Sequence, residues 1–170
     1  MKARVASGHE RALAIGALAA SWGDPIIVRG RDWRFHACLI LVVGPNLGAA
    51  AVSFAEWPIA ELVAIEAFAR GRGIGSALMA GVIDACQGCR TLRLSTTNDN
   101  LSAIRFYERR GFRLMAVRPG AVMATRERKP SIPLIGENGV EIRDEIDLEL
   151  TLSAQAGAPL KPWRRRASAG

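Results

Sequence analysis

The hydrophobic period changes repeatedly between residues 60 and 117, and this alternation constrains the fold more than any other feature of the sequence. Apolar residues first follow one another as in a strand, and from Gly73 they recur at the spacing of a helix. The pattern then repeats, which predicts strands at 60–67, 91–97 and 112–117 and helices at 73–85 and 101–109. Strands that alternate with helices predict an α/β domain in which a mixed sheet carries helices on its faces.

The N-terminal part adds a helix and a hairpin to this pattern. An amphipathic helix is predicted over residues 10–21, and strands over 26–28 and 38–43 with a charged loop between them. The turn residues Gly44-Pro45-Asn46 predict that residues 38–55 form an antiparallel hairpin.

The clearest alternation lies near the C-terminus. Ile146, Leu148 and Leu150 alternate there with Asp147 and Glu149. A period of two predicts a strand with one face in the core and the other, acidic face in water.

The length of 170 residues, at 18.3 kDa, suits one domain. Residues 118–143 interrupt the alternation with Pro119-Gly120, a short helix through Arg128 and further Pro and Gly turns. So long a connection in a compact domain usually covers a site. We therefore predict one domain over residues 1–153, with 118–143 as an inserted loop between the last two strands, and a disordered basic tail at 154–170.

The charge balance points to an anionic partner. The net charge is +7, and 20 of the 23 basic residues are arginine, whose planar fork of donors suits phosphate. Nucleic acid and a phosphorylated small molecule both fit this composition. However, Lys161 and Arg164–Arg166 carry four of the charges in the tail, where Trp163 is the one aromatic residue and no recognition helix is predicted. A solvated terminus is therefore favoured over a nucleic-acid partner.

The three cysteines are too few and of the wrong parity for a disulfide framework, which favours a reducing compartment. Cys86 and Cys89 form a C-x-x-C, but Gly88 within it is typical of a helix end, and no second pair of ligands completes a metal site. The apolar runs at 12–20 and 37–43 are too short to cross a membrane. We expect a cytoplasmic protein with no membrane partner and no metal.

A glycine-rich turn joins the strand at 60–67 to the next helix. Gly71, Gly73 and Gly75 let the backbone come close to a ligand, and free amide groups at a helix start point toward an anion. The turn predicts a phosphate cradle, with a merely tight loop as the alternative. A nucleotide-hydrolysing P-loop is excluded because no Lys follows Gly75, and the dinucleotide fingerprint fails at Ser76.

A second motif begins after the strand at 91–97. Asn100 and Tyr107 are seven residues apart on one predicted helix, which places them on one face about 10 Å apart along the axis. The two motifs read Arg70-x-x-Gly73-x-Gly75 and Asn100-x-x-Ala103-x-x-x-Tyr107-x-x-x-Gly111-Phe112. Together they resemble the pyrophosphate-binding and second signatures of the GNAT superfamily of acyl-CoA-dependent N-acyltransferases. This resemblance implies a mixed, mostly antiparallel twisted sheet with helices on both faces.

The resemblance also implies acetyl-CoA as co-substrate. The backbone amides of Arg72–Ser76 would bind the pyrophosphate, the strand end at Ala67 and Phe68 would pair with the pantetheine arm, and Asn100 would hydrogen-bond it. The implied acetyl-CoA-binding residues are Ala67, Phe68, Arg70, Gly71, Arg72, Gly73, Ile74, Gly75, Ser76 and Asn100.

Two catalytic roles follow from the same resemblance. An amine that attacks a thioester expels a thiolate, so Tyr107 would act as the general acid at the sulfur. The amine must first lose a proton, and Glu66 would accept it directly or through water. A core aromatic residue and a solvated strand residue are the alternatives for these two side chains.

The acceptor amine is not identified by the sequence. Glu137, Glu141 and Asp144 would attract a cationic amine, although a solvated loop explains each of them equally well. A non-catalytic CoA sensor and a basic nucleic-acid-associated protein are the alternative functions, and a homodimer stays open.

Overall fold

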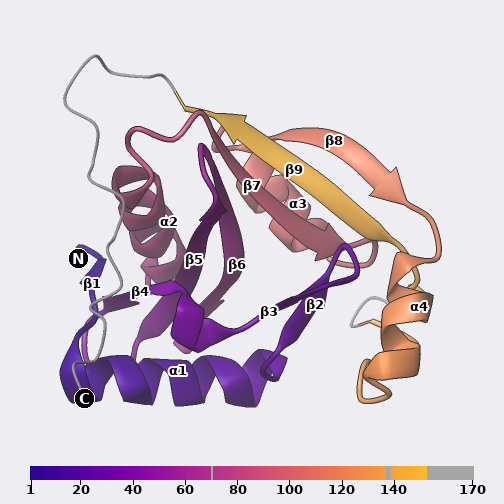
Figure 1. Ribbon diagram of the computed structural model, residues 1–170, viewed down its shortest axis with the longest axis horizontal. Coiled ribbons are helices and arrows are strands. Elements are labelled where there is room, and N and C mark those ends of the chain that lie inside the picture. The colour runs from indigo at the N-terminus through magenta and orange to yellow at the C-terminus, as the bar shows by residue number, and fades with distance from the viewer. Residues whose placement is uncertain (70, 137–138, 153–170) are drawn as a thin grey trace.

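The computed structural model describes residues 1–69, 71–136 and 139–152. Seven strands form one sheet in the order β1-β4-β5-β6-β7-β9-β8, and β2 and β3 form a separate hairpin (Figure 1). The strands are β1 (Arg4–Val5), β2 (Ile26–Val28), β3 (Arg31–Trp33), β4 (Leu39–Val43), β5 (Gly48–Glu56), β6 (Ile59–Ala67), β7 (Thr91–Thr97), β8 (Arg113–Arg118) and β9 (Glu145–Thr151). The helices are α1 (Gly8–Trp22), α2 (Ile74–Ala85), α3 (Leu101–Glu108) and α4 (Ala121–Arg128), with a short 3-10 turn at Phe35–Ala37. The mixed, mostly antiparallel α/β fold expected from the sequence is confirmed.

The parallel pair β6 and β7 creates an opening in the sheet. The other neighbouring strands in the sheet are antiparallel. Within the described residues, β6 and β7 pair only where Ile59–Glu61 meets Thr91–Arg93. Beyond that point the two strands diverge, as Figure 1 shows. The edge of β6 that faces the opening therefore keeps backbone groups that β7 does not pair.

The helices cover both faces of this sheet. Leu18 on α1 belongs to a buried cluster on one face, together with Phe35 and residues of β4 to β6. Leu78 on α2 and Tyr107 on α3 belong to the cluster on the other face. Gly81 lets α2 lie close to the residue that precedes β1, because a Cβ at this position would lie 2.6 Å from the Ala3 Cβ.

Two expectations from the sequence are wrong. The charged stretch after Val28 is not a loop, because Arg31–Trp33 forms β3 and pairs with β2. The acidic face of β9 lies only partly in water, since Asp147 is 7% exposed whereas Glu149 is half-exposed. Both errors have one cause, which is that the β2–β3 hairpin folds over this face of the sheet and brings Arg29 against the carboxylates.

The segment between β8 and β9 contains α4, whose start is held by Asp144. The Oδ1 atom of this side chain accepts a hydrogen bond from the Gly120 amide at 2.8 Å. The predicted basic tail at 154–170 lies outside the described residues. Among the helices that the structure describes, none is both long and apolar enough to cross a membrane.

Candidate functional site

The glycine-rich turn leaves backbone donors open at the start of α2. Gly71 and Gly73 have φ angles of +77° and +70°, and a Cβ at either position would meet nothing within 4 Å. Gly73 is the N-cap of α2, and no side chain caps the helix. The first amides of a helix have no partner inside it, so those that follow Gly73 form a concave set of donors. Arg70, predicted to belong to this turn, lies outside the described residues.

An arginine-lined cavity of about 680 Å³ adjoins the first turn of α2. Its lining residues come from α2, α3 and the turn after α3, and they are Ser76, Ser102, Arg105, Phe106, Arg109 and Arg110. Arg110 Nη2 donates to Ser76 Oγ at 2.6 Å, and its guanidinium lies 3.5 Å from the centroid of the Phe106 ring. Burial and the charge of Arg109 lower the pKa of Arg110. A bound anion would relieve this accumulation of positive charge.

The three arginines of this cavity were not among the residues predicted to form the site. Arg105 and Arg109 are four residues apart and therefore share one face of a helix. This spacing, in the helix that Asn100 begins, could have indicated a basic surface beside the predicted cradle.

Asn100 and Tyr107 lie at opposite ends of α3. Asn100 is its N-cap, and the side-chain Oδ1 accepts a hydrogen bond from the Ala103 amide at 3.2 Å. Tyr107 is buried between aromatic rings, 5.4 Å from the Phe106 centroid and 5.5 Å from the Phe112 centroid. Burial raises the pKa of Tyr107 to about 12. The phenol is therefore protonated at neutral pH and retains a proton to donate.

Glu66 stands near the end of β6, on the other side of the sheet from Tyr107. Ile65 packs against the α2–α3 cluster, and successive strand residues alternate between faces, so Glu66 is directed toward the α1 side. Glu66 is half-buried. Ala67 ends the strand, and the amide of Phe68 donates to the Leu47 carbonyl at 2.9 Å. Glu66 and Tyr107 thus lie on opposite faces of the sheet.

An ion-pair network lies on the α1 side of this opening. Arg93 Nε on β7 donates to Glu61 Oε2 on β6 at 2.9 Å, at the last pair that the two strands form. Arg29, at the tip of the β2–β3 hairpin, forms an ion pair with Glu61 and donates to Ser95 Oγ at 2.7 Å. Burial raises the pKa of Glu61 more than the two arginines lower it. The hairpin is thereby tied to both strands that border the opening.

Arg118, at the end of β8, extends the same network. Its Nη2 donates to Glu145 Oε2 at 2.7 Å and to Asp147 Oδ1 at 2.8 Å. Burial alone would raise the pKa of Asp147, but hydrogen bonds from Arg118 and Ser95 hold it below its usual range. Local sequence patterns do not indicate this network, because its members come from four strands and a hairpin turn.

Metal-ligating residues do not gather in the part of the chain that the structure describes. No group of three or more His, Cys, Asp or Glu side chains is placed to hold a metal ion there. Cys86 and Cys89 are both buried as free thiols, and burial raises the pKa of Cys86 to about 12. A thiol with so high a pKa is a poor metal ligand and a poor nucleophile.

Comparison with known protein families shows which family the chain belongs to. The family described as Acetyltransferase (GNAT) family matches residues 17–112. The chain belongs to this GNAT acetyltransferase family. The matched residues include the glycine-rich turn, Asn100 and Tyr107, so the resemblance expected from the sequence is confirmed.

Two curated relatives are similar to part of this GNAT chain. The uncharacterized protein YdhI of Bacillus subtilis (strain 168) is 43% identical over 88 residues, which are 51% of this chain and 55% of the relative. The uncharacterized protein YxbD of the same organism is 39% identical over the same shares. The chain thus spans about half the length of the curated relatives it matches.

Solved structures share the fold over most of the chain. A Bacillus subtilis acetyltransferase in complex with CoA has a TM-score of 0.66 and 17% identity, and the match covers 89% of this chain and 98% of that one. A GNAT family acetyltransferase from Elizabethkingia anophelis with acetyl-CoA bound has a TM-score of 0.64 and 18% identity, with 89% and 97% covered. At these identities the likeness establishes the GNAT fold.

Proposed function

We propose that this GNAT chain transfers an acetyl group from acetyl-CoA directly to a primary amine in a ternary complex. The observation that carries the proposal is the juxtaposition of a phosphate cradle and an arginine-lined cavity with the opening between β6 and β7. We assign the activity to one domain of residues 1–153, in the cytoplasm. The three free cysteines, all buried, support a reducing compartment.

The residues present fit acetyl-CoA. Its pyrophosphate needs several donors at once, which the backbone amides of Arg72–Ser76 offer at the start of α2. Arg105 and Arg109 add two positive charges in the adjoining cavity. The free edge of β6 near Ala67 offers backbone groups to the amides of the pantetheine arm. When bound, acetyl-CoA supplies an acetyl group activated as a thioester.

The reaction also requires proton transfers from the acceptor amine and to the leaving thiolate. Glu66 is the proposed base that takes a proton from the acceptor ammonium, directly or through water, so that the amine nitrogen becomes nucleophilic. A new C–N bond forms at the acetyl carbon while the C–S bond breaks. The electron pair of the C–S bond goes to sulfur. Tyr107 donates its phenolic proton to this thiolate, and the second proton that the nitrogen loses as the amide forms returns to the phenolate, directly or through water. No covalent bond to the enzyme is needed.

Calorimetry and a thiol-release assay test the proposal together. We expect acetyl-CoA to bind the full chain, and Tyr107→Phe to bind it with similar affinity while releasing thiol at least about 100-fold more slowly with an amine panel. A chain that does not bind acetyl-CoA refutes the proposal. Unimpaired turnover by Tyr107→Phe removes the acid role of this phenol and leaves the transfer itself intact.

A further inference from the structure

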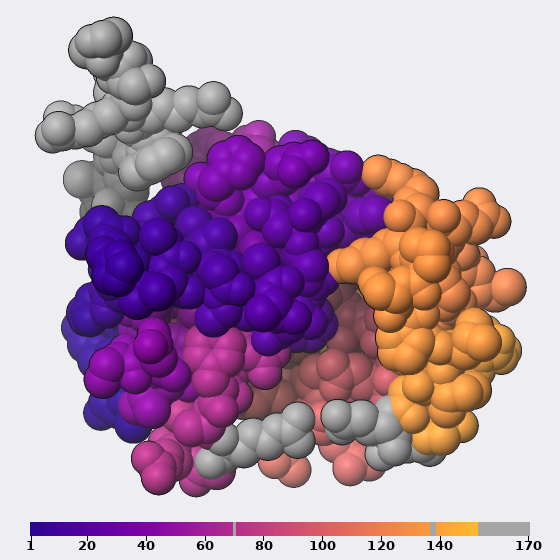
Figure 2. Space-filling view, turned by 90° about the horizontal axis from the view of Figure 1, so that it is seen from below, coloured from indigo at the N-terminus to yellow at the C-terminus, as the bar shows by residue number. Residues whose placement is uncertain are grey.

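A second cavity lies on the α1 side of the sheet, between the tip of the β2–β3 hairpin and α4. Figure 2 shows the molecule hollowed between the violet N-terminal elements and the orange segment that carries α4. The cavity has a volume of about 330 Å³. The residues that line it are Ile27, Arg29, Gly30, Arg118, Ala121, Ala124, Thr125 and Arg128.

This cavity is connected to the β6–β7 opening through its own arginines. Arg29 Nη1 donates to Ser95 Oγ on β7 at 2.7 Å, and Arg118 Nη2 donates to Asp147 Oδ1 on β9 at 2.8 Å. Leu94, next to Ser95, packs in the cluster that contains Tyr107, so Ser95 faces the opposite side. The cavity therefore lies beside the opening, on the face that is not occupied by α2 and α3.

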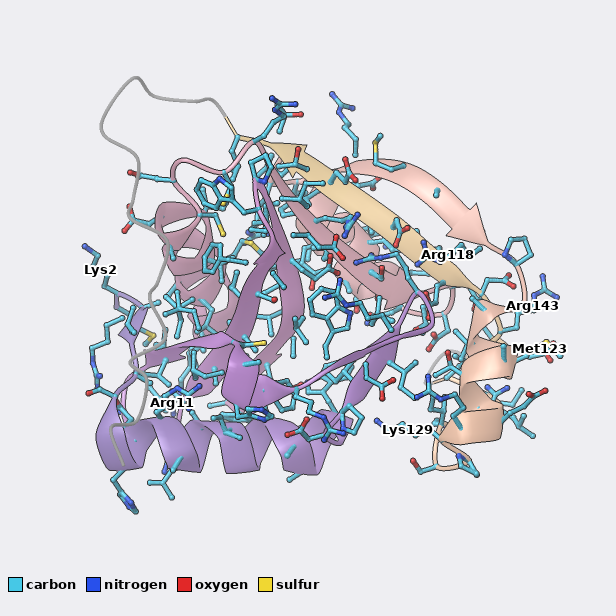
Figure 3. The ribbon with its side chains drawn as sticks, viewed as in Figure 1. Lys2, Arg11, Arg118, Met123, Lys129 and Arg143 are labelled. Atoms are coloured by element: carbon cyan, nitrogen blue, oxygen red, sulfur yellow. The ribbon has the colours of Figure 1, made fainter. Side chains whose placement is uncertain are left out.

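The charged groups that line the cavity are guanidiniums. Three arginines line it, each paired with a carboxylate, and none of the described residues that line it is acidic. The carboxylates that balance Arg29 and Arg118 lie behind them, on β6 and β9. In Figure 3 Arg118 points inward over β9, whereas Met123 on α4 points away from the molecule. A ligand in this cavity would meet guanidinium groups before it met a carboxylate.

Arg128 is the arginine best placed to turn toward a ligand. Its side chain is 51% exposed, and its Nη2 donates to Asp32 Oδ1 at 2.7 Å, from α4 to the hairpin. An exposed ion pair of this kind contributes little to stability, so its guanidinium is easily redirected. Lys129, the next residue, donates to the Trp22 carbonyl and joins α4 to the end of α1. The Lys129 contact fixes the end of α4 and does not depend on where the Arg128 side chain turns.

We propose that this cavity binds an anionic group of the acceptor, which is thus a small primary amine that carries a carboxylate or a phosphate. The inference rests on the proposed acetyl transfer. Of the three acidic residues expected to attract the ammonium group, Glu137 lies outside the described residues, Glu141 is exposed, and Asp144 is engaged by Gly120 and Arg143. Their role stays a prediction. The volume suits a small molecule.

Direct binding tests the cavity without any turnover. Succinate and inorganic phosphate are titrated into the full chain, into Ala124→Phe, which fills the cavity, and into the matched Met123→Phe on the outer face of α4. We expect binding of at least one anion to weaken about ten-fold or more in Ala124→Phe and to be unchanged in Met123→Phe. Equal affinity in the three proteins, or no binding of either anion to any of them, overturns the proposal.

Turnover with matched amines tests the assignment to the acceptor. Each amine is tested in two forms. One form carries a carboxylate or phosphate, and in the other this group is replaced by a neutral amide or alcohol. We expect the charged member to be preferred by about ten-fold or more in kcat/KM, and Arg128→Gln to raise its KM with little change in kcat. The control Arg113→Gln removes a charge outside the cavity and should change neither. Preference for neutral members, or a preference that Arg128→Gln leaves intact, overturns the assignment.

The two proposals fail in different ways. A chain that does not bind acetyl-CoA refutes acetyl transfer, whereas loss of the difference between Ala124→Phe and Met123→Phe refutes the anion site. If the cavity bound anions while the chain did not bind acetyl-CoA, it would be a site for small anions, and its proposed role in binding the acceptor would be overturned.

Discussion

The guanidinium of Arg118 on β8 forms two ion-pair contacts with the buried Asp147 carboxylate on β9. Removing the Asp147 charge weakens this network, although Arg118 keeps Glu145 and Arg29 keeps Glu61 as partners. We expect Asp147→Asn to lower the free energy of unfolding by about 1–3 kcal/mol, measured by urea denaturation. Glu149→Gln, on the same face of β9 and half-exposed, is the matched control and should cost less than about 0.5 kcal/mol. Equal losses in both variants would contradict a buried network.

The same carboxylate makes the stability of the protein depend on pH in the acidic range. Because the pKa of Asp147 is lowered in the folded state, its contribution to stability is present above its unfolded pKa of about 3.9 and is lost as the pH falls through the folded value. We expect the stability gap between the wild type and Asp147→Asn to shrink as the pH falls below about 4. Unfolding midpoints over an acidic pH series measure the gap, and a constant gap would exclude this linkage.

The segment from 60 to 117 could be predicted from the sequence because its elements are specified locally. The hydrophobic period, the glycine-rich turn and the cap at Asn100 are each contained within one helix or strand and its adjoining turn. The glycine-rich turn and the position of Tyr107 on α3 follow from spacing, whereas the interpretation of the turn as a phosphate cradle needed the second motif as well.

The ion-pair network could not be predicted in this way. The alternation of Asp147 with apolar neighbours indicates which face of β9 it occupies, but not what covers that face. The cover is the β2–β3 hairpin, which precedes β9 by more than 100 residues and brings Arg29 to it. Such a burial depends on long-range packing, and the sequence offers only the Arg29-Gly30 turn as a local sign.

Tyr107 offers a direct spectroscopic test, because it is the only tyrosine in the chain. Its ionisation alone produces the tyrosinate absorbance of the protein. We expect a midpoint near pH 12 in the folded chain, and near about 10 after denaturation in guanidinium. Since the folded pKa is raised, stability should fall as the pH rises through this window. A folded midpoint near about 10 would show that the phenol is not buried as described.

Two glycines should respond in opposite directions to alanine. A Cβ at Gly48 would lie 2.6 Å from Ile74 Cγ2 and 2.8 Å from the Glu66 carbonyl oxygen, so Gly48→Ala should cost about 1–3 kcal/mol of stability and weaken acetyl-CoA binding. Gly16 is exposed in α1 with nothing within 4 Å, and Gly16→Ala should stabilise the chain by about 0.5–1 kcal/mol. Thermal denaturation and calorimetry measure both effects. Stabilisation by Gly48→Ala would contradict the close approach of β5 to α2.

The arginines of α3 and the turn after it should determine affinity for acetyl-CoA rather than the rate of transfer. Arg105 and Arg109 line the cavity beside the cradle, and neither is proposed to transfer a proton. We expect Arg105→Gln and Arg109→Gln each to weaken acetyl-CoA binding by about ten-fold, with kcat at saturating acetyl-CoA within about two-fold of the wild type.

The salt dependence of that binding supplies the control for charge. Attraction between arginines and phosphates is screened as ionic strength rises, so affinity should fall with added salt, and less steeply in Arg109→Gln than in the wild type. Arg113→Gln removes one charge from β8 outside this cavity and should leave the affinity within about two-fold. An Arg113→Gln chain weakened as much as Arg109→Gln would indicate that overall charge attracts acetyl-CoA, and that the cavity beside α2 does not bind it.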